Sequence, residues 1–328
     1  MTTGGSAATR EAITTALTDR RPAFRDQGLQ SGGPPLVLYT SAEAHRSVDK
    51  AAANLGIGLA NVRHIPVDEA FRMRTDVLSA AITADRDAGL EPFCVVATAG
   101  TTTSGSIDPV DAIADVCARE GLWLHVDGAY GALFVLAESA RAAFAPLVLA
   151  DSIALDPHKM LFAPVEAGAL LVKDKAKLRA AFAFPASYLT VAEDDLMVDF
   201  MDYGPQLSRG FKALKVWAAL RTFGVDAFRG TAQRCLDLAA HLATRIDAEP
   251  GLELMNPVTL TAVCVRVRGR TDAEHRELLA RLNADGTALL GPAVLHGRAG
   301  IRACIANHRT TLADIDLLAD RLSGFANS

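Results

Sequence analysis

Short apolar runs rich in β-forming residues alternate with longer helical patterns through the first two hundred residues of the chain. This alternation is typical of a mainly parallel sheet covered by helices on both faces. Several of the runs show no polar alternation, as is expected of strands buried on both faces. We therefore expect an α/β fold, with strands at 36–40, 61–65, 93–98, 123–127, 152–155 and 167–172 and helices at 10–18, 45–55, 76–89 and 109–120, the last capped by Asp108.

The last third of the chain predicts a smaller α+β unit. An amphipathic helix over 209–223 places Phe211, Leu214, Trp217 and Leu220 at helical spacing, and we expect it to bridge the two units. Within the smaller unit the patterns predict helices at 226–249, 272–284 and 311–322 and strands at 260–267, 288–295 and 301–305.

Length, charge and cysteine content narrow the class of protein. At 328 residues the chain exceeds the size at which one core usually stops growing, so we expect two domains, 1–222 and 223–328. The net charge of -5 and the lack of a dense Lys/Arg run argue against a nucleic-acid partner and favour a small molecule. Five scattered cysteines without a CxxC pair indicate neither a disulfide framework nor a metal site. The first residues do not resemble a signal peptide, and no apolar run is long enough to span a membrane. We therefore expect a cytoplasmic protein that does not contact membranes.

Polar residues follow the expected strands, and ligands of open α/β sheets bind at the carboxyl ends of strands. Gly5 and Ser6 lead into a helix, where free backbone N–H groups and a hydroxyl would suit a phosphate. Taken alone, a turn with a serine cap is the better interpretation of these two residues. His45 follows the first strand and would suit stacking on an aromatic ring or acid/base chemistry, although a lone histidine is usually structural.

The next two strand ends carry a hydroxyl-rich turn and a carboxylate. The turn at 99–106, which includes Thr102, has glycines that let a ligand come close, although ordinary loops share this composition. Asp127 ends an apolar strand and is followed by small residues such as Ala129. A buried carboxylate is costly unless it meets a positive partner, and a protonated pyridine nitrogen is one such partner. The competing interpretation is an aspartate satisfied by backbone amides.

Lys159 lies just past the strand at 152–155, beside Asp156 and His158. A lysine that is removed from water has a lowered pKa and becomes a nucleophilic amine. The lysines at 173–177, by contrast, lie in a charged cluster that is typical of a solvated face.

The chain resembles the group II pyridoxal-phosphate decarboxylases, the fold-type I family that includes the aromatic-L-amino-acid, histidine and glutamate decarboxylases. The resemblance extends from the first residues into the C-terminal domain. It rests on four stretches, 39–50, 95–109, 123–131 and 150–159, that match in motif and in order. It implies a fold-type I architecture with a mainly parallel, seven-stranded type of sheet, pyridoxal 5'-phosphate (PLP) as cofactor, and a homodimer.

The resemblance also implies a role for each site residue. Lys159 would hold PLP as a Schiff base, Asp127 would pair with the pyridine nitrogen, and His45 would stack on the ring and take part in catalysis. Gly5, Ser6 and His158 fall at phosphate-binding positions, and Thr102, Ala129 and Asp156 are the remaining cofactor-binding positions.

The segment 184–205 is polar, acidic and weakly periodic, and a loop of this length inside a domain is more often functional than incidental. Tyr188 falls where the family's mobile loop carries a tyrosine that helps to protonate the substrate carbon after carbon dioxide leaves. Loops that close over substrate are a common enzyme device. The resemblance therefore implies Tyr188 as a third catalytic residue beside Lys159 and His45.

Two features depart from the family's pattern. Ala7 stands two residues after the second glycine of the phosphate turn, where the family usually has a glutamate. The sequence also begins within that turn and lacks the family's N-terminal segment, which interlocks the dimer and lines part of the substrate pocket. A fragment, a mis-assigned start and a degenerate copy all stay open, and we expect exposed apolar surface where such a segment would dock.

The expected reaction is the decarboxylation of an L-amino acid to an amine and carbon dioxide by a carboxy-lyase. The stretch 301–311 resembles the bacterial aromatic-type members, which favours an aromatic substrate. Glutamate, diaminobutyrate and other non-aromatic amino acids are alternatives. Two rival classes are another fold-type I PLP enzyme, such as an aminotransferase or a cysteine desulfurase, and an inactive truncated homologue that only binds PLP. The motif at 100–109 and Tyr188 argue against the first rival.

Overall fold

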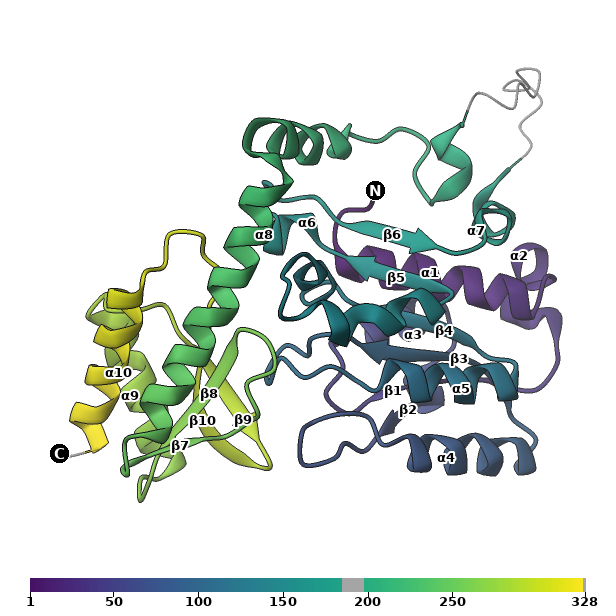
Figure 1. Ribbon diagram of the computed structural model, residues 1–328. Coiled ribbons are helices and arrows are strands. Elements are labelled where there is room, and N and C mark those ends of the chain that lie inside the picture. The colour runs from purple at the N-terminus through teal and green to yellow at the C-terminus, as the bar shows by residue number, and fades with distance from the viewer. Residues whose placement is uncertain (185–197, 327–328) are drawn as a thin grey trace.

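A six-stranded sheet forms the centre of the larger part of the protein (Figure 1). The computed structural model describes residues 1–184 and 198–326. The strand order is β2-β1-β3-β4-β5-β6, and β6 alone runs antiparallel to its neighbour. The strands are β1 (Leu36–Ser41), β2 (Val62–Ile65), β3 (Glu91–Thr98), β4 (Trp123–Asp127), β5 (Ser152–Leu155) and β6 (Ala169–Val172).

The mainly parallel α/β class is confirmed, and each of the six predicted strands is present. The sheet has one strand fewer, within the described residues, than the seven that the resemblance implied. The number seven came from the family, whereas the sequence showed six apolar runs of strand length before residue 184. Next to β6, Thr2 pairs with Gly168 through two backbone hydrogen bonds of 2.8 and 3.1 Å.

Helices cover both faces of this sheet because alternate residues of each strand point to opposite sides. Leu36 and Leu38 of β1 pack in the cluster that contains α1 and α3 residues, whereas Val37 and Tyr39 pack in the cluster that contains α4 and α5 residues. The longer helices of this part are α1 (Gly5–Arg20), α3 (Ser47–Asn54), α4 (Thr75–Asp87), α5 (Val110–Glu120) and α7 (Lys175–Phe182). Shorter turns are α2 (Phe24–Gln27), η1 (Gly28–Ser31), η2 (Leu59–Asn61), η3 (Ala132–Leu136), η4 (Arg141–Leu149), α6 (Pro157–Met160) and η5 (Phe200–Tyr203).

The second part of the protein is built on a four-stranded antiparallel sheet of order β7-β8-β10-β9. Its strands are β7 (Leu252–Leu254), β8 (Ala262–Val267), β9 (Gly291–Leu295) and β10 (Arg298–Cys304), and its helices are α8 (Lys212–Asp247), α9 (Asp272–Ala284) and α10 (Leu312–Ala326). Helix α8 breaks at Gly224, whose φ of 75° is not helical. The domain boundary expected at 222/223 lies beside this break and stays a prediction. The short strand β7 was not anticipated, because three residues are too few for a periodic pattern.

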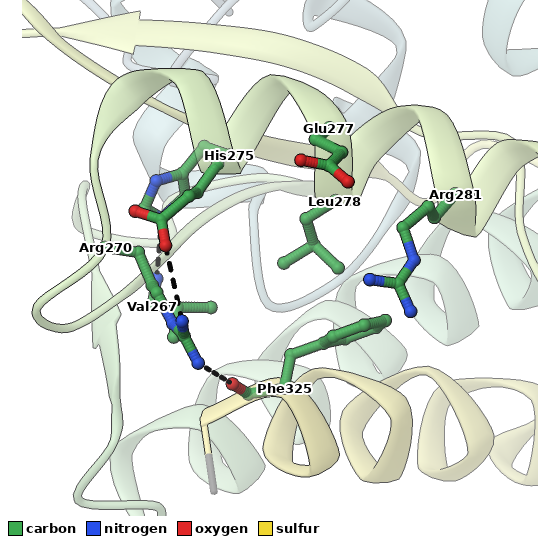
Figure 2. Close-up of a pocket in the computed structure, with 8 residues that line it drawn as sticks. Val267, Arg270, His275, Glu277, Leu278, Arg281 and Phe325 are labelled. Carbon is green, nitrogen blue, oxygen red and sulfur yellow. Dashed lines mark hydrogen bonds and ion pairs between the residues drawn. The ribbon is translucent and has the colours of Figure 1, made fainter. Parts of the chain in front are cut away.

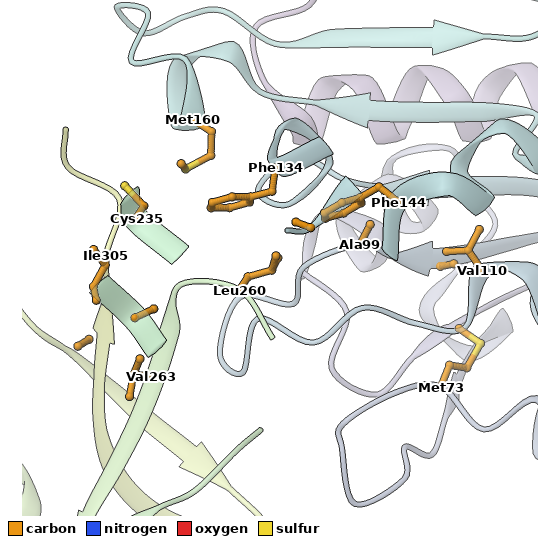
Figure 3. Packing of buried hydrophobic residues seen from close by; sticks show 14 of the residues in the cluster. Met73, Ala99, Val110, Phe134, Phe144, Met160, Cys235, Leu260, Val263 and Ile305 are labelled. Carbon is orange, nitrogen blue, oxygen red and sulfur yellow. The ribbon is translucent and has the colours of Figure 1, made fainter. Parts of the chain in front are cut away.

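One continuous apolar core joins the two sheets (Figure 3). Phe134 and Met160 from the large part and Leu260 and Ile305 from the small part belong to the same buried cluster. Gly131 lies at this junction, where a Cβ would come within 2.1 Å of the Ala99 carbonyl oxygen. Close packing here sets the ends of β3 and β4 against the small unit.

The structure corrects three local predictions. Asp108 does not cap α5, because its carboxylate accepts the N–H groups of Met73 and Thr98 at 2.7 and 2.8 Å. His45 does not open a helix, since α3 begins at Ser47. The helix predicted to begin at 209 begins at Lys212, and Phe211, Leu214 and Trp217 are exposed, because periodicity predicts an apolar face but not what covers it. Among the described helices, none combines the length and the hydropathy needed to cross a membrane.

Candidate cofactor and active site

A pocket of about 350 Å³ opens at the carboxyl ends of the parallel strands. It lies where the start of α1, the turn after β1 and the ends of β3, β4 and β5 meet, as the topology of an open α/β sheet predicts. All nine residues predicted to bind a cofactor line it: Gly5, Ser6, His45, Thr102, Asp127, Ala129, Asp156, His158 and Lys159. Tyr188, predicted as a catalytic residue, lies outside the described residues.

The glycine turn before α1 brings the backbone against the end of β5. A Cβ on Gly5 would lie 2.6 Å from the Ala129 Cβ and 3.2 Å from an Asp156 carboxylate oxygen, so only glycine fits. Helix α1 begins at Gly5 with Gly4 as its N-cap and no side-chain cap, which makes the serine-cap interpretation of Ser6 wrong. The first turn holds no acidic residue, so the positive end of this helix faces the pocket without a carboxylate of its own.

Asp127 is the last residue of β4 and is 7 % exposed. Its Oδ1 accepts the Ala129 N–H at 3.1 Å, so the competing interpretation of a backbone-satisfied carboxylate holds for one oxygen. In the described part of the chain no ion pair forms with Asp127. The carboxylate therefore lines the pocket with its charge uncompensated, as a site for a cationic ligand group requires.

His125 lies two residues before Asp127, on the same face of β4, and is fully buried. Burial lowers the pKa of His125 to about 4, so the imidazole is neutral at physiological pH. Its Nδ1 lies 2.9 Å from the Ser152 hydroxyl oxygen, which also accepts the Trp123 indole N–H at 2.9 Å. His125 thus adds no positive charge that would compete for Asp127.

Lys159 follows β5 in the short helix α6, and its Nζ lies 3.2 Å from an oxygen of the buried Asp156 carboxylate. His158 Nε2 lies 3.5 Å from the same oxygen, and its Nδ1 accepts the Ala167 N–H at 3.1 Å. The expectation of a desolvated Lys159 is wrong for this chain, because the side chain is 43 % exposed. It faces the open pocket rather than the core.

Three buried side-chain oxygens around the pocket have no hydrogen-bond partner among the described residues: Ser47 Oγ, Thr98 Oγ1 and Asp156 Oδ1. Buried polar atoms are nearly always bonded, and unpartnered ones at a pocket point to a bound group. A ligand with a phosphate, an aromatic ring and an aldehyde would meet the glycine turn, His45 and Lys159 here. The residues present therefore fit PLP.

Other residues line the pocket without having been predicted as site residues, among them Ser47, Thr98, Gly100 and Tyr130. Tyr130 and Gly100 lie inside the quoted motifs, but sequence alone did not show that they meet. A Cβ on Gly100, whose φ is +105°, would lie 2.9 Å from Tyr130 Cδ1. Thr98 is paired in register with Asp127 of the neighbouring strand, and that register is set by the sheet rather than by local sequence.

A second pocket of about 210 Å³ lies in the small unit between α9 and α10 (Figure 2). Arg270 donates to Glu274 at 3.3 Å and to the Phe325 carbonyl at 3.4 Å, and the Arg281 guanidinium lies 5.0 Å from the centre of the Phe325 ring. None of the predicted site residues that the structure describes lines this pocket. The candidate site is therefore the pocket at the strand ends.

An α/β fold with a lysine, a buried aspartate and a glycine turn converging on one pocket defines a pyridoxal-phosphate site. The model of the family described as "Pyridoxal-dependent decarboxylase conserved domain" matches residues 1–268. The chain belongs to this family, and PLP is its cofactor.

Relatives in the family differ in substrate. The aromatic-L-amino-acid decarboxylase of Bacillus atrophaeus is 34 % identical over 310 residues, which cover 92 % of this chain and 64 % of the relative. Human cysteine sulfinic acid decarboxylase is 34 % identical over 338 residues, covering 97 % and 68 %. The chain thus spans about two thirds of the length of these two relatives.

Solved structures agree with the fold. The crystal structure of mouse CSAD superimposes with a TM-score of 0.90 at 32 % identity, covering 99 % of this chain and 71 % of the other. The crystal structure of Oryza sativa TDC with PLP and tryptamine has a TM-score of 0.90 at 28 % identity, covering 98 % and 68 %. The fold-type I architecture implied by the resemblance is therefore confirmed.

Proposed function

We propose that this chain is a PLP-dependent carboxy-lyase that converts an L-amino acid to the corresponding amine and carbon dioxide. The observation that carries the proposal is the convergence of Lys159, Asp127 and the Gly5 turn, from three distant segments, on one pocket. Family membership supports the same activity.

Each predicted cofactor-binding residue has a proposed part in holding the cofactor. Lys159 would hold its aldehyde group through Nζ, Asp127 would pair with the pyridine nitrogen, and His45 would stack on the ring. Gly5, Ser6 and His158 would hold the phosphate, and Thr102, Ala129 and Asp156 would complete the contacts. When bound, the cofactor supplies an electron sink for the bond broken at the substrate α-carbon.

The chain's own side chains prepare this chemistry. Asp156, held 3.2 Å from Lys159 Nζ and 3.5 Å from His158 Nε2, orients both side chains toward the pocket. The neutral His125 behind Asp127 leaves the aspartate charge for the ligand. Tyr188 is proposed to deliver a proton to the α-carbon after carbon dioxide leaves, and changing it to Phe is expected to lower the amine yield and divert product to aldehyde by reaction with oxygen.

An aromatic L-amino acid is the proposed substrate. Within the described residues that line the pocket, Lys159 is the only lysine or arginine, so a second carboxylate on an acidic substrate would find no counter-ion besides the cofactor-binding lysine. Tyr130 and Val165 add apolar surface for a ring. Comparing carbon dioxide release from L-phenylalanine, L-tyrosine and L-tryptophan with release from L-glutamate, L-cysteine sulfinate and L-2,4-diaminobutyrate tests this choice. A preference for either acidic substrate would overturn it.

The decisive experiment has two stages. PLP uptake by the purified chain is measured as a visible absorbance band that is lost in Lys159→Ala, with Lys175→Ala, at an exposed lysine, as the matched control. Amine and carbon dioxide are then quantified against keto acid and sulfide. Keto acid as the main product would support an aminotransferase, and PLP uptake without any turnover would support the inactive homologue.

A homodimer is proposed from the apolar face over 198–223. Phe211 and Trp217 on it are 74 % and 59 % exposed, and large exposed apolar patches mark association sites. A second copy of the chain is the proposed occupant, and Trp217→Glu should shift the mass measured by light scattering from dimer toward monomer. A wild-type chain that is monomeric at micromolar concentration would contradict this.

A cytoplasmic location is also proposed, because the five free cysteines suit a reducing compartment.

A further inference from the structure

The loop that carries Thr102 is folded on itself by short hydrogen bonds. In this Thr102 loop (residues 100–106), the Gly100 and Thr101 N–H groups donate to the Ser106 carbonyl at 3.0 and 2.9 Å. The Thr101 hydroxyl lies 2.7 Å from the Ser104 hydroxyl and accepts the Ser106 N–H at 3.0 Å. These bonds leave the three carbonyls at 102–104 free to face away from the pocket.

Those three consecutive carbonyls are each held by a side chain of the small unit. Arg302 of β10 donates to the Thr102 carbonyl, the Cys264 thiol of β8 donates to the Thr103 carbonyl at 3.3 Å, and Asn256 Nδ2 donates to the Ser104 carbonyl at 2.8 Å. The three donors come from separate segments of the small unit. Because three side chains that are distant in sequence bond the three consecutive carbonyls at 102–104, they fix both the position and the tilt of the loop.

The contact is close as well as polar. A Cβ on Gly105, whose φ is +70°, would lie 3.2 Å from the Ala262 Cβ, so β8 packs directly on the loop. Asn256 is 4 % exposed, and its Oδ1 accepts the Cys264 N–H at 2.9 Å, which ties two of the donors together. The small sheet is therefore a rigid backing for one wall of the pocket.

We propose that Asn256, Cys264 and Arg302 are positioning residues, which hold the Thr102 loop so that Thr102 meets the cofactor. We call the three side chains the loop clamp. This inference rests on the proposed function, because it assigns the loop clamp to the PLP site described above. Through it the small unit, which contributes none of the described residues that line the pocket, sets the shape of that pocket.

The test compares two arginines on the same strand. Arg302→Met breaks the bond to the Thr102 carbonyl. Arg298→Met, the control, breaks an ion pair with Glu253 at 2.8 Å on β10 away from the loop. Arg302→Lys keeps one donor and serves as the conservative rescue. Cys264→Ala, which removes one weak donor, is the second variant should Arg302→Met fail to fold.

Two readouts separate positioning from mere stability. Amide hydrogen exchange in the PLP-free chain should rise about tenfold at Gly100, Thr101 and Gly105 in Arg302→Met, because a hydrogen bond to a charged donor is lost. The Kd for PLP should rise about fivefold to tenfold, and the visible circular dichroism of bound PLP should weaken. Arg302→Lys should fall between wild type and Arg302→Met, Arg298→Met should match wild type, and Cys264→Ala should show a smaller shift in the same direction.

Two outcomes of these measurements would overturn the inference. Wild-type exchange in Arg302→Met would show that the loop clamp does not hold the loop. Faster exchange with unchanged PLP affinity and unchanged circular dichroism would make the contacts merely structural, and either outcome overturns the inference. If the wild-type chain takes up no PLP, the proposed function falls and the inference falls with it, a result that the wild-type titration reports separately from any variant.

Discussion

Two groups of buried polar side chains differ in their hydrogen bonding: three in the large sheet near the pocket, and two in the core of the small unit. Thr98 and Asp156, at strand ends of the large sheet, and His125, in the middle of β4, each leave one buried side-chain atom without a partner in the described structure. Asn256 and His275, equally buried in the small unit, have the polar atoms of both ends of their side chains bonded.

This difference in hydrogen bonding distinguishes residues of a ligand site from residues that only stabilise the fold. An unpartnered buried atom lowers stability, and one that lies at a pocket is accounted for when a ligand completes its bond. A fully bonded polar group, by contrast, holds the fold together. Substitutions at the strand ends should therefore affect ligand binding and chemistry, whereas a substitution in the small unit away from the loop clamp, such as one at His275, should affect the free energy of unfolding.

The largest effect is expected for Asp127→Asn. The amide keeps an oxygen for the Ala129 N–H, so the folded structure should survive, but the negative charge facing the pyridine nitrogen is lost. Removing one preorganised electrostatic group typically lowers kcat by about 10²- to 10³-fold. We expect a loss of this size in amine formation, with a Tm close to that of wild type by calorimetry. Activity within about threefold of wild type would remove Asp127 from the mechanism.

A pH effect of up to about 3 kcal/mol is expected from His125, since each unit of pKa shift is worth about 1.4 kcal/mol. Burial lowers its pKa to about 4, whereas the unfolded chain has the ordinary value near 6.5. Between these two values the unfolded state binds more protons, so stability is present above the window and is lost as the pH falls through it.

Replacing His125 by Gln removes this titration. Denaturant unfolding at pH 7 and at pH 4.5 should show that wild type loses more free energy of unfolding than His125→Gln over that range. Parallel losses in the two proteins would mean that His125 is not the neutral, buried group described above.

His275→Phe probes the opposite case in the small unit. His275 Nε2 accepts the Val267 N–H at 2.9 Å, and its Nδ1 donates to the Thr271 carbonyl at 2.7 Å. The substitution leaves a buried N–H unpaired, which costs about 2 kcal/mol. Urea unfolding should show this loss, and the Kd for PLP should be unchanged. A weaker PLP affinity without a loss of stability would reverse the distinction between the two parts.

The strands and the site residues of the large sheet were predictable from sequence because local patterns determine them. An unbroken apolar run such as 93–98 predicts a buried strand, and the polar residue after each run lies at the same edge of a parallel sheet. Asp127 and Lys159 were found in this way, and the family resemblance then implied a role for each of them.

Contacts between distant segments were not predictable. The opposition of Thr98 and Asp127 depends on the register of β3 and β4, and the meeting of Asn256 with the Ser104 carbonyl depends on how two sheets pack. The exposure of Lys159 also depends on the tertiary arrangement, since the same strand-end position would be buried if the pocket were closed. Local sequence carries no signal for any of these.

The smallest effect comes from a matched pair of threonines. Thr98 and Thr261 are both buried, but Thr98 Oγ1 lacks a partner in the described chain, whereas Thr261 Oγ1 lies 2.6 Å from the Tyr130 hydroxyl. Thr98→Val should leave the free energy of unfolding within about 0.5 kcal/mol of wild type, whereas Thr261→Val should lower it by about 1 kcal/mol.

The affinity for PLP should also differ between the Thr98→Val and Thr261→Val variants. If the Thr98 hydroxyl completes a bond with the cofactor, its loss raises the Kd for PLP about fivefold, as one neutral hydrogen bond is worth about 1 kcal/mol. Fluorescence titration of Thr98→Val with PLP measures this. Equal stability losses in the two variants, with no change in PLP affinity for Thr98→Val, would mean that Thr98 is a scaffold residue that happens to lie beside Asp127. A loss of affinity confined to Thr98→Val would extend the site to the hydroxyl on the neighbouring strand, because the register of β3 and β4 places it opposite the aspartate.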